Sequence, residues 1–145
     1  MNKPVRTALP VLDRREFLAQ GTITLSALML AACGGSDNPT SPGTVNVTAT
    51  PASYPALANV GGIARLSGTS TPIALVRSST SSYRAFWLVC PHAGSTVGIN
   101  GTSFLCPGHG AMFSATGAWT GGQPTSGLYE FTVTSDANGT LTITA

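Results

Sequence analysis

The sequence predicts an all-β fold, an antiparallel sandwich or barrel. From residue 45 onward, short runs rich in β-branched and aromatic residues alternate with Gly, Pro, Ser and Asn, which is the pattern of strands joined by turns. No stretch of this part repeats apolar residues at helical spacing over three turns. The segments 99–102 and 137–140 each place Asn-Gly between two such runs, and this dipeptide is the strongest short signal for a hairpin.

The predicted strands follow one another between turn residues. The first runs, rich in Val, Ile, Leu or Thr, are 45–49, 63–67 and 73–77. The next runs, each with an aromatic or β-branched residue ahead of a Gly or Pro loop, are 84–89, 96–99, 103–105, 112–114 and 118–120. The last two, 128–134 and 140–144, flank the second Asn-Gly pair.

Core candidates come from the strand pattern. Tyr129, Phe131 and Val133 alternate with polar residues and therefore share one face of a strand. Trp87 and Trp119 lie in predicted strands and are expected in the core, with a docking role as the alternative.

Residues 1–32 are expected to be an export signal that is not part of the domain. Basic residues precede the apolar run 21–32, which is shorter than the about 20 residues of a membrane span. The segment "DRREFLA", with the pair Arg14 and Arg15, resembles the twin-arginine signal that exports folded proteins. A chance arginine pair and an uncleaved signal anchor are the alternatives.

The run ends in "LAAC", which resembles the lipobox of bacterial lipoproteins. The resemblance implies that Cys33 carries a diacylglycerol and becomes the first residue of a protein anchored to a membrane, in the periplasm or on the cell surface. Residues 33–44 would then be a flexible linker rich in Gly, Ser and Pro. Residues 45–145 remain as one domain.

Charge excludes one class of partner. From Cys33 onward, Arg65, Arg77 and Arg84 balance Asp37, Glu130 and Asp136, so the formal net charge is zero. Binding of nucleic acid needs a basic patch, and none is expected.

Two short phrases hold both histidines of the chain and two of its three cysteines. They are "LVCPHAG" at 88–94 and "FLCPGHG" at 104–110, and each follows the end of a predicted strand. Cys90, His92, Cys106 and His109 give the pattern C-x-H, thirteen residues, C-x-x-H. A zinc site, a Cys90–Cys106 disulfide and a two-iron cluster all remain possible, but one Cys and one His from each loop suits the cluster best.

The phrases "CPHAG" and "CPGHG" resemble the Rieske iron–sulfur family, and the resemblance extends over residues 45–145. It implies a sandwich or barrel with a subdomain of two loops that binds one [2Fe-2S] cluster per chain. Cys90 and Cys106 would hold the outer iron, which stays ferric, and His92 and His109 the iron that is reduced. A proline loop from Gly121 to Gly127, with Pro124 at its bend, would cover the cluster.

The chain departs from the respiratory and photosynthetic members that it resembles. Ser95 and Gly108 stand where those proteins have a pair of disulfide-forming cysteines. The loops must then be held by the cluster and by hydrogen bonds, one of them from Ser95, and they should loosen when iron is lost.

Two further positions bear on the redox potential. Ala111 and Phe113 replace a Ser and a Tyr that donate hydrogen bonds to sulfur in high-potential members. We therefore expect a potential in the lower or middle part of the family range of about −150 to +300 mV.

The function expected from the sequence is one-electron transfer with a redox partner protein. The alternatives are an electron-transfer subunit of a larger exported oxidoreductase or quinol-oxidising complex, and a zinc module without redox activity. The chain has no histidine beyond the expected ligands and few carboxylates. An unaided catalyst is therefore not predicted.

Overall fold

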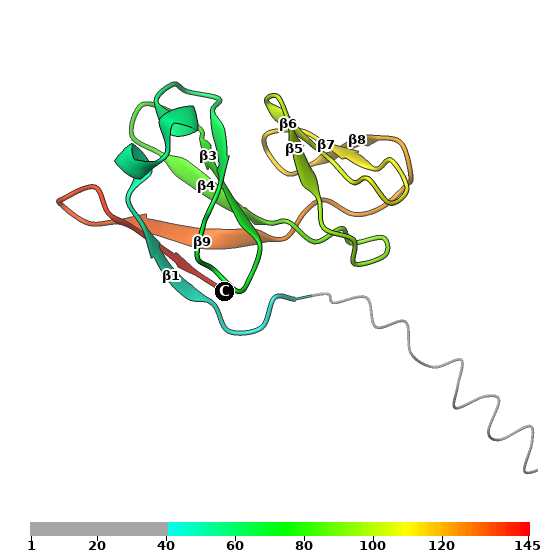
Figure 1. The fold of residues 1–145 in the computed structure, drawn as a ribbon, viewed down its shortest axis with the longest axis horizontal. Helices are drawn as coiled ribbons and strands as arrows, with labels where there is room; N and C mark the ends of the chain where they lie inside the picture. The colour runs from blue at the N-terminus through cyan, green and yellow to red at the C-terminus, as the bar shows by residue number, and fades with distance from the viewer. Residues whose placement is uncertain (1–40) are drawn as a thin grey trace, which may run out of the picture. The chain divides into compact units, whose positions relative to one another are not determined.

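Two antiparallel sheets make up residues 41–145, the part of the chain that the computed structural model describes (Figure 1). The predicted signal at 1–32, Cys33 and the linker as far as residue 40 lie outside the described residues. The predicted all-β class is confirmed, and every predicted strand is present, with its ends at most two residues from the predicted ones. Across 41–145 no helix has the length and apolar character needed to cross a membrane.

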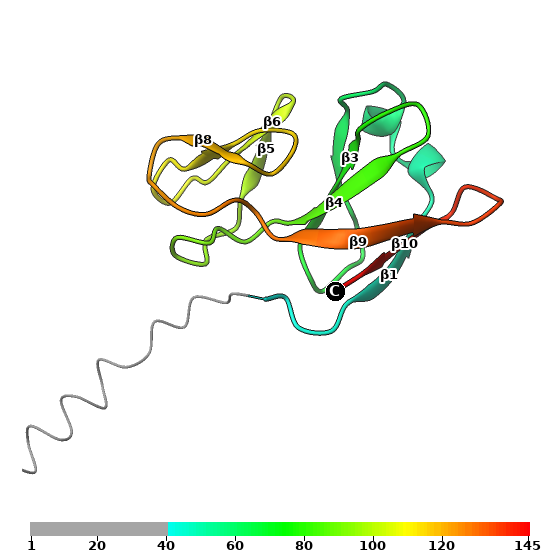
Figure 2. The ribbon, with the colours of Figure 1, turned by 180° about the vertical axis from the view of Figure 1, so that it is seen from behind.

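The larger sheet has six strands, and its neighbours in order are β1 (Asn46–Ala49), β10 (Leu141–Thr144), β9 (Glu130–Ser135), β4 (Tyr83–Trp87), β3 (Ile73–Arg77) and β2 (Ile63–Arg65). The smaller sheet has four strands in chain order, β5 (Gly98–Asn100), β6 (Ser103–Leu105), β7 (Met112–Phe113) and β8 (Trp119–Gly121). Figures 1 and 2 show the smaller sheet, in yellow, beside the larger one.

Two short 3-10 turns between β1 and β2 were not predicted. They are η1 (Pro51–Ser53) and η2 (Pro55–Leu57), and each begins with a proline. Three residues are too few to show a helical period, and a proline at the first position is favourable because it lacks the N–H that would go unbonded there.

The middle strands of the larger sheet are buried on both faces. In β3, Ile73 and Leu75 belong to one apolar cluster, and Ala74 and Val76 belong to a second. This explains why the strand is an unbroken apolar run and does not alternate. The second cluster includes residues of the smaller sheet, so it joins the two sheets.

Phe86 of β4 is the centre of this junction. Its ring meets Phe104 of β6 edge to face, with ring centroids 6.0 Å apart. A Cβ added to Gly117, in the turn between β7 and β8, would lie 2.5 Å from the Phe86 ring. The backbone of the smaller sheet therefore packs directly on an aromatic side chain of the larger one.

The core predictions hold with one exception. Phe131 is buried, and Tyr129 and Val133 pack partly buried on the same cluster. Trp87 is buried, but Trp119 is 41% exposed, so the prediction that it lies in the core is wrong. Trp119 lies on β8, one of the two edge strands of the smaller sheet, and its indole N–H donates to the carbonyl of Gln123 at 3.0 Å.

Both Asn-Gly hairpins are confirmed. Gly101 turns the chain from β5 to β6 with φ of 60°, and Gly139 turns it from β9 to β10 with φ of 79°. In the second hairpin, Asp136 Oδ1 accepts hydrogen bonds from the N–H groups of Asn138 and Thr140, at 2.9 and 2.8 Å. Local turn chemistry therefore fixes this register.

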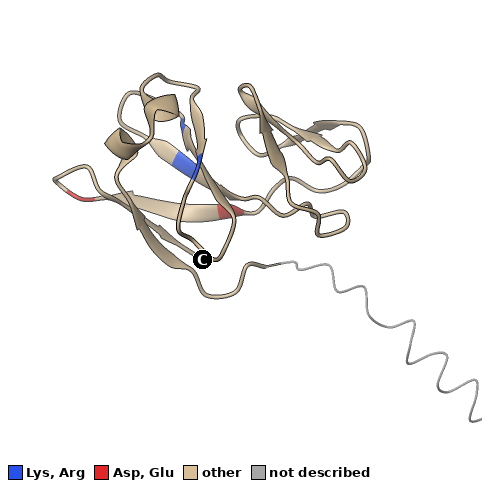
Figure 3. Cartoon of the chain, in the orientation of Figure 1, with Lys and Arg blue, Asp and Glu red and all other residues tan. Residues whose placement is uncertain are grey.

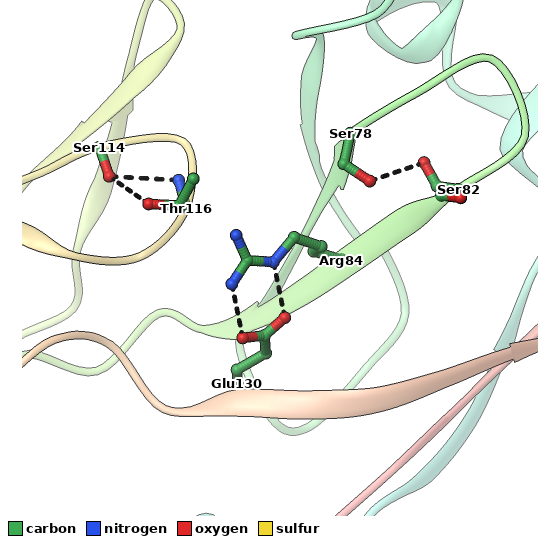
Figure 4. A network of polar contacts seen from close by, with 6 residues as sticks. All are labelled: Ser78, Ser82, Arg84, Ser114, Thr116 and Glu130. Carbon is green, nitrogen blue, oxygen red and sulfur yellow. Dashed lines mark hydrogen bonds and ion pairs between the residues drawn. The ribbon is translucent and has the colours of Figure 1, made fainter.

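Formal charges lie outside the smaller sheet. Residues 85–129 contain no Asp, Glu, Lys or Arg, and Figure 3 shows this part of the chain in tan throughout. At its border, Arg84 of β4 and Glu130 of β9 form a bidentate ion pair with two contacts of 2.7 Å (Figure 4). The hydrogen bond from Arg84 lowers the pKa of Glu130.

The hairpin at Gly139 gives a stability prediction. Replacing Gly139 by Ala should lower the free energy of unfolding by about 1 kcal/mol, because an L side chain is strained at positive φ. A Cβ at Gly139 meets no atom within 4 Å, so strain is the sole expected cost. The measurement is thermal unfolding of the full chain.

Gly98→Ala is the matched control. Gly98 does not have positive φ, and its added Cβ would make an ordinary contact of 3.6 Å with the Leu105 carbonyl. Equal melting temperatures for the two variants would contradict the prediction.

Candidate metal centre

The first Cys/His loop, residues 90–95, is closed by its own backbone. The N–H of Cys90 donates to the carbonyl of Ser95 at 2.8 Å, and the N–H of Gly94 donates to the carbonyl of Cys90 at 2.8 Å. The flanking residues Val89 and Thr96 pair as an antiparallel bridge. The segment is thus a tight loop that connects two paired chain segments.

The second Cys/His loop, residues 106–111, repeats this frame at the same offsets from its cysteine. The N–H of Cys106 donates to the carbonyl of Ala111 at 2.8 Å, and the N–H of Gly110 donates to the carbonyl of Cys106 at 2.9 Å. The flanking residues Leu105 and Met112 are register partners of β6 and β7. The two loops therefore have equivalent backbones.

The glycine four positions after each cysteine makes this frame possible. Gly94 has φ of 69° and Gly110 has φ of 75°, a region that L side chains avoid. Their role was missed by the sequence analysis, although the signal was present as a Gly at the same offset in both phrases.

The two sulfur atoms lie at the bottom of the site. Cys90 is 1% exposed and Cys106 is 0% exposed, and both are free thiols. Each sulfur accepts hydrogen bonds from the N–H groups of the second and third residues after it, His92 and Ala93 for Cys90, and Gly108 and His109 for Cys106. Again the two loops match.

The thiols differ in their acidity. Burial raises the pKa of Cys90. Burial also acts to raise the pKa of Cys106, but hydrogen bonds from the Cys90 thiol, from its own loop and from Ser95 outweigh it and lower that pKa. Cys106 is therefore the thiol that more readily ionises, with Cys90 as its donor.

The two imidazoles lie together on the outer side. The rings of His92 and His109 are 4.7 Å apart between centroids, at 84° to each other. His92 is half-buried, with its Nδ1 atom buried, and His109 is exposed. Because the sulfurs are buried and the rings are not, the expectation that the cysteines hold an outer iron is corrected: the thiol pair is the inner one.

This donor set can hold a dinuclear cluster. The thiols form one hydrogen-bonded pair, and the imidazoles form another pair in ring contact. Two thiolates on one iron and two imidazoles on the other is the ligand pattern of a Rieske [2Fe-2S] centre. The residues present fit that group.

The neighbouring positions singled out by sequence have distinct settings. Ser95 is half-buried and donates a hydrogen bond to the Cys106 sulfur, and Gly108 lies against it. Ala111 and Phe113 are fully buried and have no side-chain donor. Pro124 is exposed.

The segment from Gly121 to Gly127 packs on the second loop through Gly122. A Cβ at Gly122 would lie 1.8 Å from the carbonyl oxygen of Gly110 and 3.3 Å from Cα of Ala111. Only a residue without a side chain permits this approach of two backbones. Trp119 supports the segment through its hydrogen bond to Gln123.

Gly122→Ala should therefore displace this segment from the second loop. The added Cβ meets backbone, which no side-chain rotation relieves, so amide hydrogen exchange across 106–128 should become faster. Gly101→Ala is the matched control, because Gly101 also has positive φ but its Cβ would meet nothing within 4 Å. Equal exchange across 106–128 in both variants would contradict the predicted contact.

Comparisons with known proteins agree with this geometry. Residues 55–132 match the Rieske [2Fe-2S] domain family. The sequence has no match among curated proteins.

Several solved structures are similar in fold. A quaternary ammonium Rieske monooxygenase, CntA, is 22% identical with a TM-score of 0.53, and the match covers 69% of this chain and 30% of that one. A quaternary ammonium Rieske monooxygenase described for carnitine oxidation by gut microbiota is 22% identical with a TM-score of 0.52, and the match covers 69% of this chain and 30% of that one. The plasma membrane Rieske protein PetC3 of Synechocystis PCC 6803 is 24% identical with a TM-score of 0.48, and the match covers 56% of this chain and 84% of that one.

The chain thus spans 30% of the length of the monooxygenases that it matches. Their likeness concerns the fold, whereas the family match covers more than half of the present chain and includes both Cys/His loops. The protein belongs to the Rieske [2Fe-2S] domain family, whose cofactor is a [2Fe-2S] cluster that serves in electron transfer.

Proposed function

We propose that Cys90, Cys106, His92 and His109 bind one [2Fe-2S] cluster and that the protein is an exported, lipid-anchored carrier of single electrons. The observation that carries the proposal is the pair of equivalent loops, which bring two buried thiols together and two imidazoles together. When bound, the cluster accepts and releases one electron.

The protein's own groups suit that task. Four backbone N–H groups point at the two sulfurs, and such donors favour the ionised sulfur that binds metal. Burial of the sulfurs in the apolar cluster between the sheets keeps water from them. The imidazoles are the ligands nearest to the surface, so we place the exit and entry of electrons at that edge.

The exported location rests on the sequence. The apolar run before Cys33 and the arginine pair at 14 and 15 favour export of a folded protein, followed by attachment of lipid to Cys33. Assembly of the cluster before export requires a route that carries folded proteins, so the twin-arginine signal and the cofactor support each other. The flexible linker at 33–44 would let the domain move some distance away from the membrane surface.

The partner is expected to dock through short-range contacts. Residues 85–129, which include both loops, have no formally charged side chain, so little long-range attraction arises from this half of the domain. A permanent subunit of a larger exported oxidoreductase is the alternative partner arrangement, and copurification from membranes with a second protein would favour it.

Replacement of single cysteines tests the ligand assignment. Cys90→Ser and Cys106→Ser should each abolish the visible absorbance of the cluster and its iron and acid-labile sulfide, because each removes a ligand. Cys33→Ser is the matched control: it should keep a normal cluster and move the protein from the membrane fraction to the soluble one. A colourless wild-type protein with bound zinc would contradict the proposal, and so would a Cys90→Ser variant with an unchanged cluster.

The absence of formal charge from residues 85–129 predicts weak salt dependence. Rates of reduction of the oxidised protein, whose cluster and ligands sum to zero charge, by a small anionic and a small cationic reductant should each change by less than about twofold between low and high salt. Thr96→Lys, an exposed position beside the first loop, is the control: it should make the rates depend on salt in opposite directions for the two reductants. Strong salt dependence in the wild type would contradict the prediction.

A further inference from the structure

Ser95 breaks the equivalence of the two loops. Counted from the cysteine, Ser95 in the first loop corresponds to Ala111 in the second, and the backbone carbonyls of both accept the hydrogen bond that closes their loop. Each sulfur also receives the same two backbone N–H bonds from its own loop. The difference between the loops at this position is one hydroxyl group.

The hydrogen bond of the Ser95 hydroxyl joins the two loops. Ser95 belongs to the loop of Cys90, yet it donates its hydrogen bond to the sulfur of Cys106. Ala111 is buried and offers no reciprocal donor to Cys90. Cys106 therefore has three protein donors besides the Cys90 thiol, two from its own backbone and one from the opposite loop.

Gly108 provides the room for this contact. A Cβ at Gly108 would lie 2.7 Å from Ser95 Oγ, 3.3 Å from Ser95 Cβ and 3.8 Å from Cys106 Sγ. Gly108 does not have positive φ, so the backbone does not require glycine there. The lack of space requires glycine, because any side chain at 108 would occupy the place of the Ser95 hydroxyl.

We propose that the Ser95 hydroxyl is a positioning group that ties the two Cys/His loops together and raises the midpoint potential of the bound cluster, and that Gly108 is its necessary complement. The proposal rests on the ligand assignment proposed above. One-electron reduction adds one negative charge to the cluster and its sulfur ligands, and a donor aimed at a sulfur stabilises that charge more in the reduced state. Ser95 would thus supply part of the stabilisation that is missing at Ala111 and Phe113.

The test is a redox titration of the full-length, cluster-loaded protein, followed by visible absorbance and by electron paramagnetic resonance of the reduced state. Ser95→Ala should lower the equilibrium constant for reduction about tenfold, which is ~59 mV for a one-electron couple. Ser103→Ala is the matched control, since it removes a hydroxyl that bonds the Asn100 carbonyl in the β5–β6 hairpin. The control should keep the wild-type potential.

Gly108→Ala tests the same contact without removing the hydroxyl. It should lower the potential in the wild-type background, because the new Cβ displaces Ser95 Oγ, and it should add little in the Ser95→Ala background. Such non-additivity is the mark of a direct interaction. If Ser95→Ala does not retain a cluster, the single variant Gly108→Ala, which keeps Ser95, decides whether this contact raises the potential.

The outcomes separate the two proposals. A wild-type protein without a two-iron cluster would overturn the ligand assignment itself. A wild-type protein with the cluster, and with Ser95→Ala or Gly108→Ala at the wild-type potential, would overturn the role of Ser95 and leave the ligand assignment intact.

Discussion

The site depends on two backbone hydrogen bonds that occur in the same form in both Cys/His loops. In each loop the cysteine N–H reaches the carbonyl five residues ahead, and the cysteine carbonyl receives the N–H four residues ahead. A loop closed at both groups of one residue leaves that residue little freedom. The N–H groups of the second and third residues after each cysteine then point at its sulfur. The backbone of each loop therefore fixes the position of its own thiol.

The rest of the fold holds these two loops against each other. The first loop leaves the larger sheet after β4, and the second joins β6 to β7 of the smaller sheet. Phe86 and Phe104 link the sheets through one apolar cluster that also contains both cysteines. The cluster that joins the two sheets thus also holds the two thiols.

Much of this could be predicted from the sequence, because strands bounded by Gly and Pro and two Asn-Gly hairpins are local signals. The face of Trp119 could not, since β8 has three residues and alternation over so short a strand does not identify the buried side. The two seven-residue phrases also do not tell which ligand pair is inner, because the thiols are buried in an apolar cluster that gathers residues of β3, β4, β6 and β7 from both sheets. The hydroxyl of Ser95 was recognised as a donor, but its acceptor depends on how the two loops meet.

The absence of formal charge from residues 85–129 has a consequence for the energetics of electron arrival. A charged side chain near a redox centre, with its attached water, must reorient when the charge of the centre changes. Here the neighbouring polar groups are backbone N–H groups and one serine hydroxyl, already aimed at the sulfurs. Fixed dipoles of this kind are preorganised, so on the side of the sulfurs the protein would need little rearrangement when an electron is added.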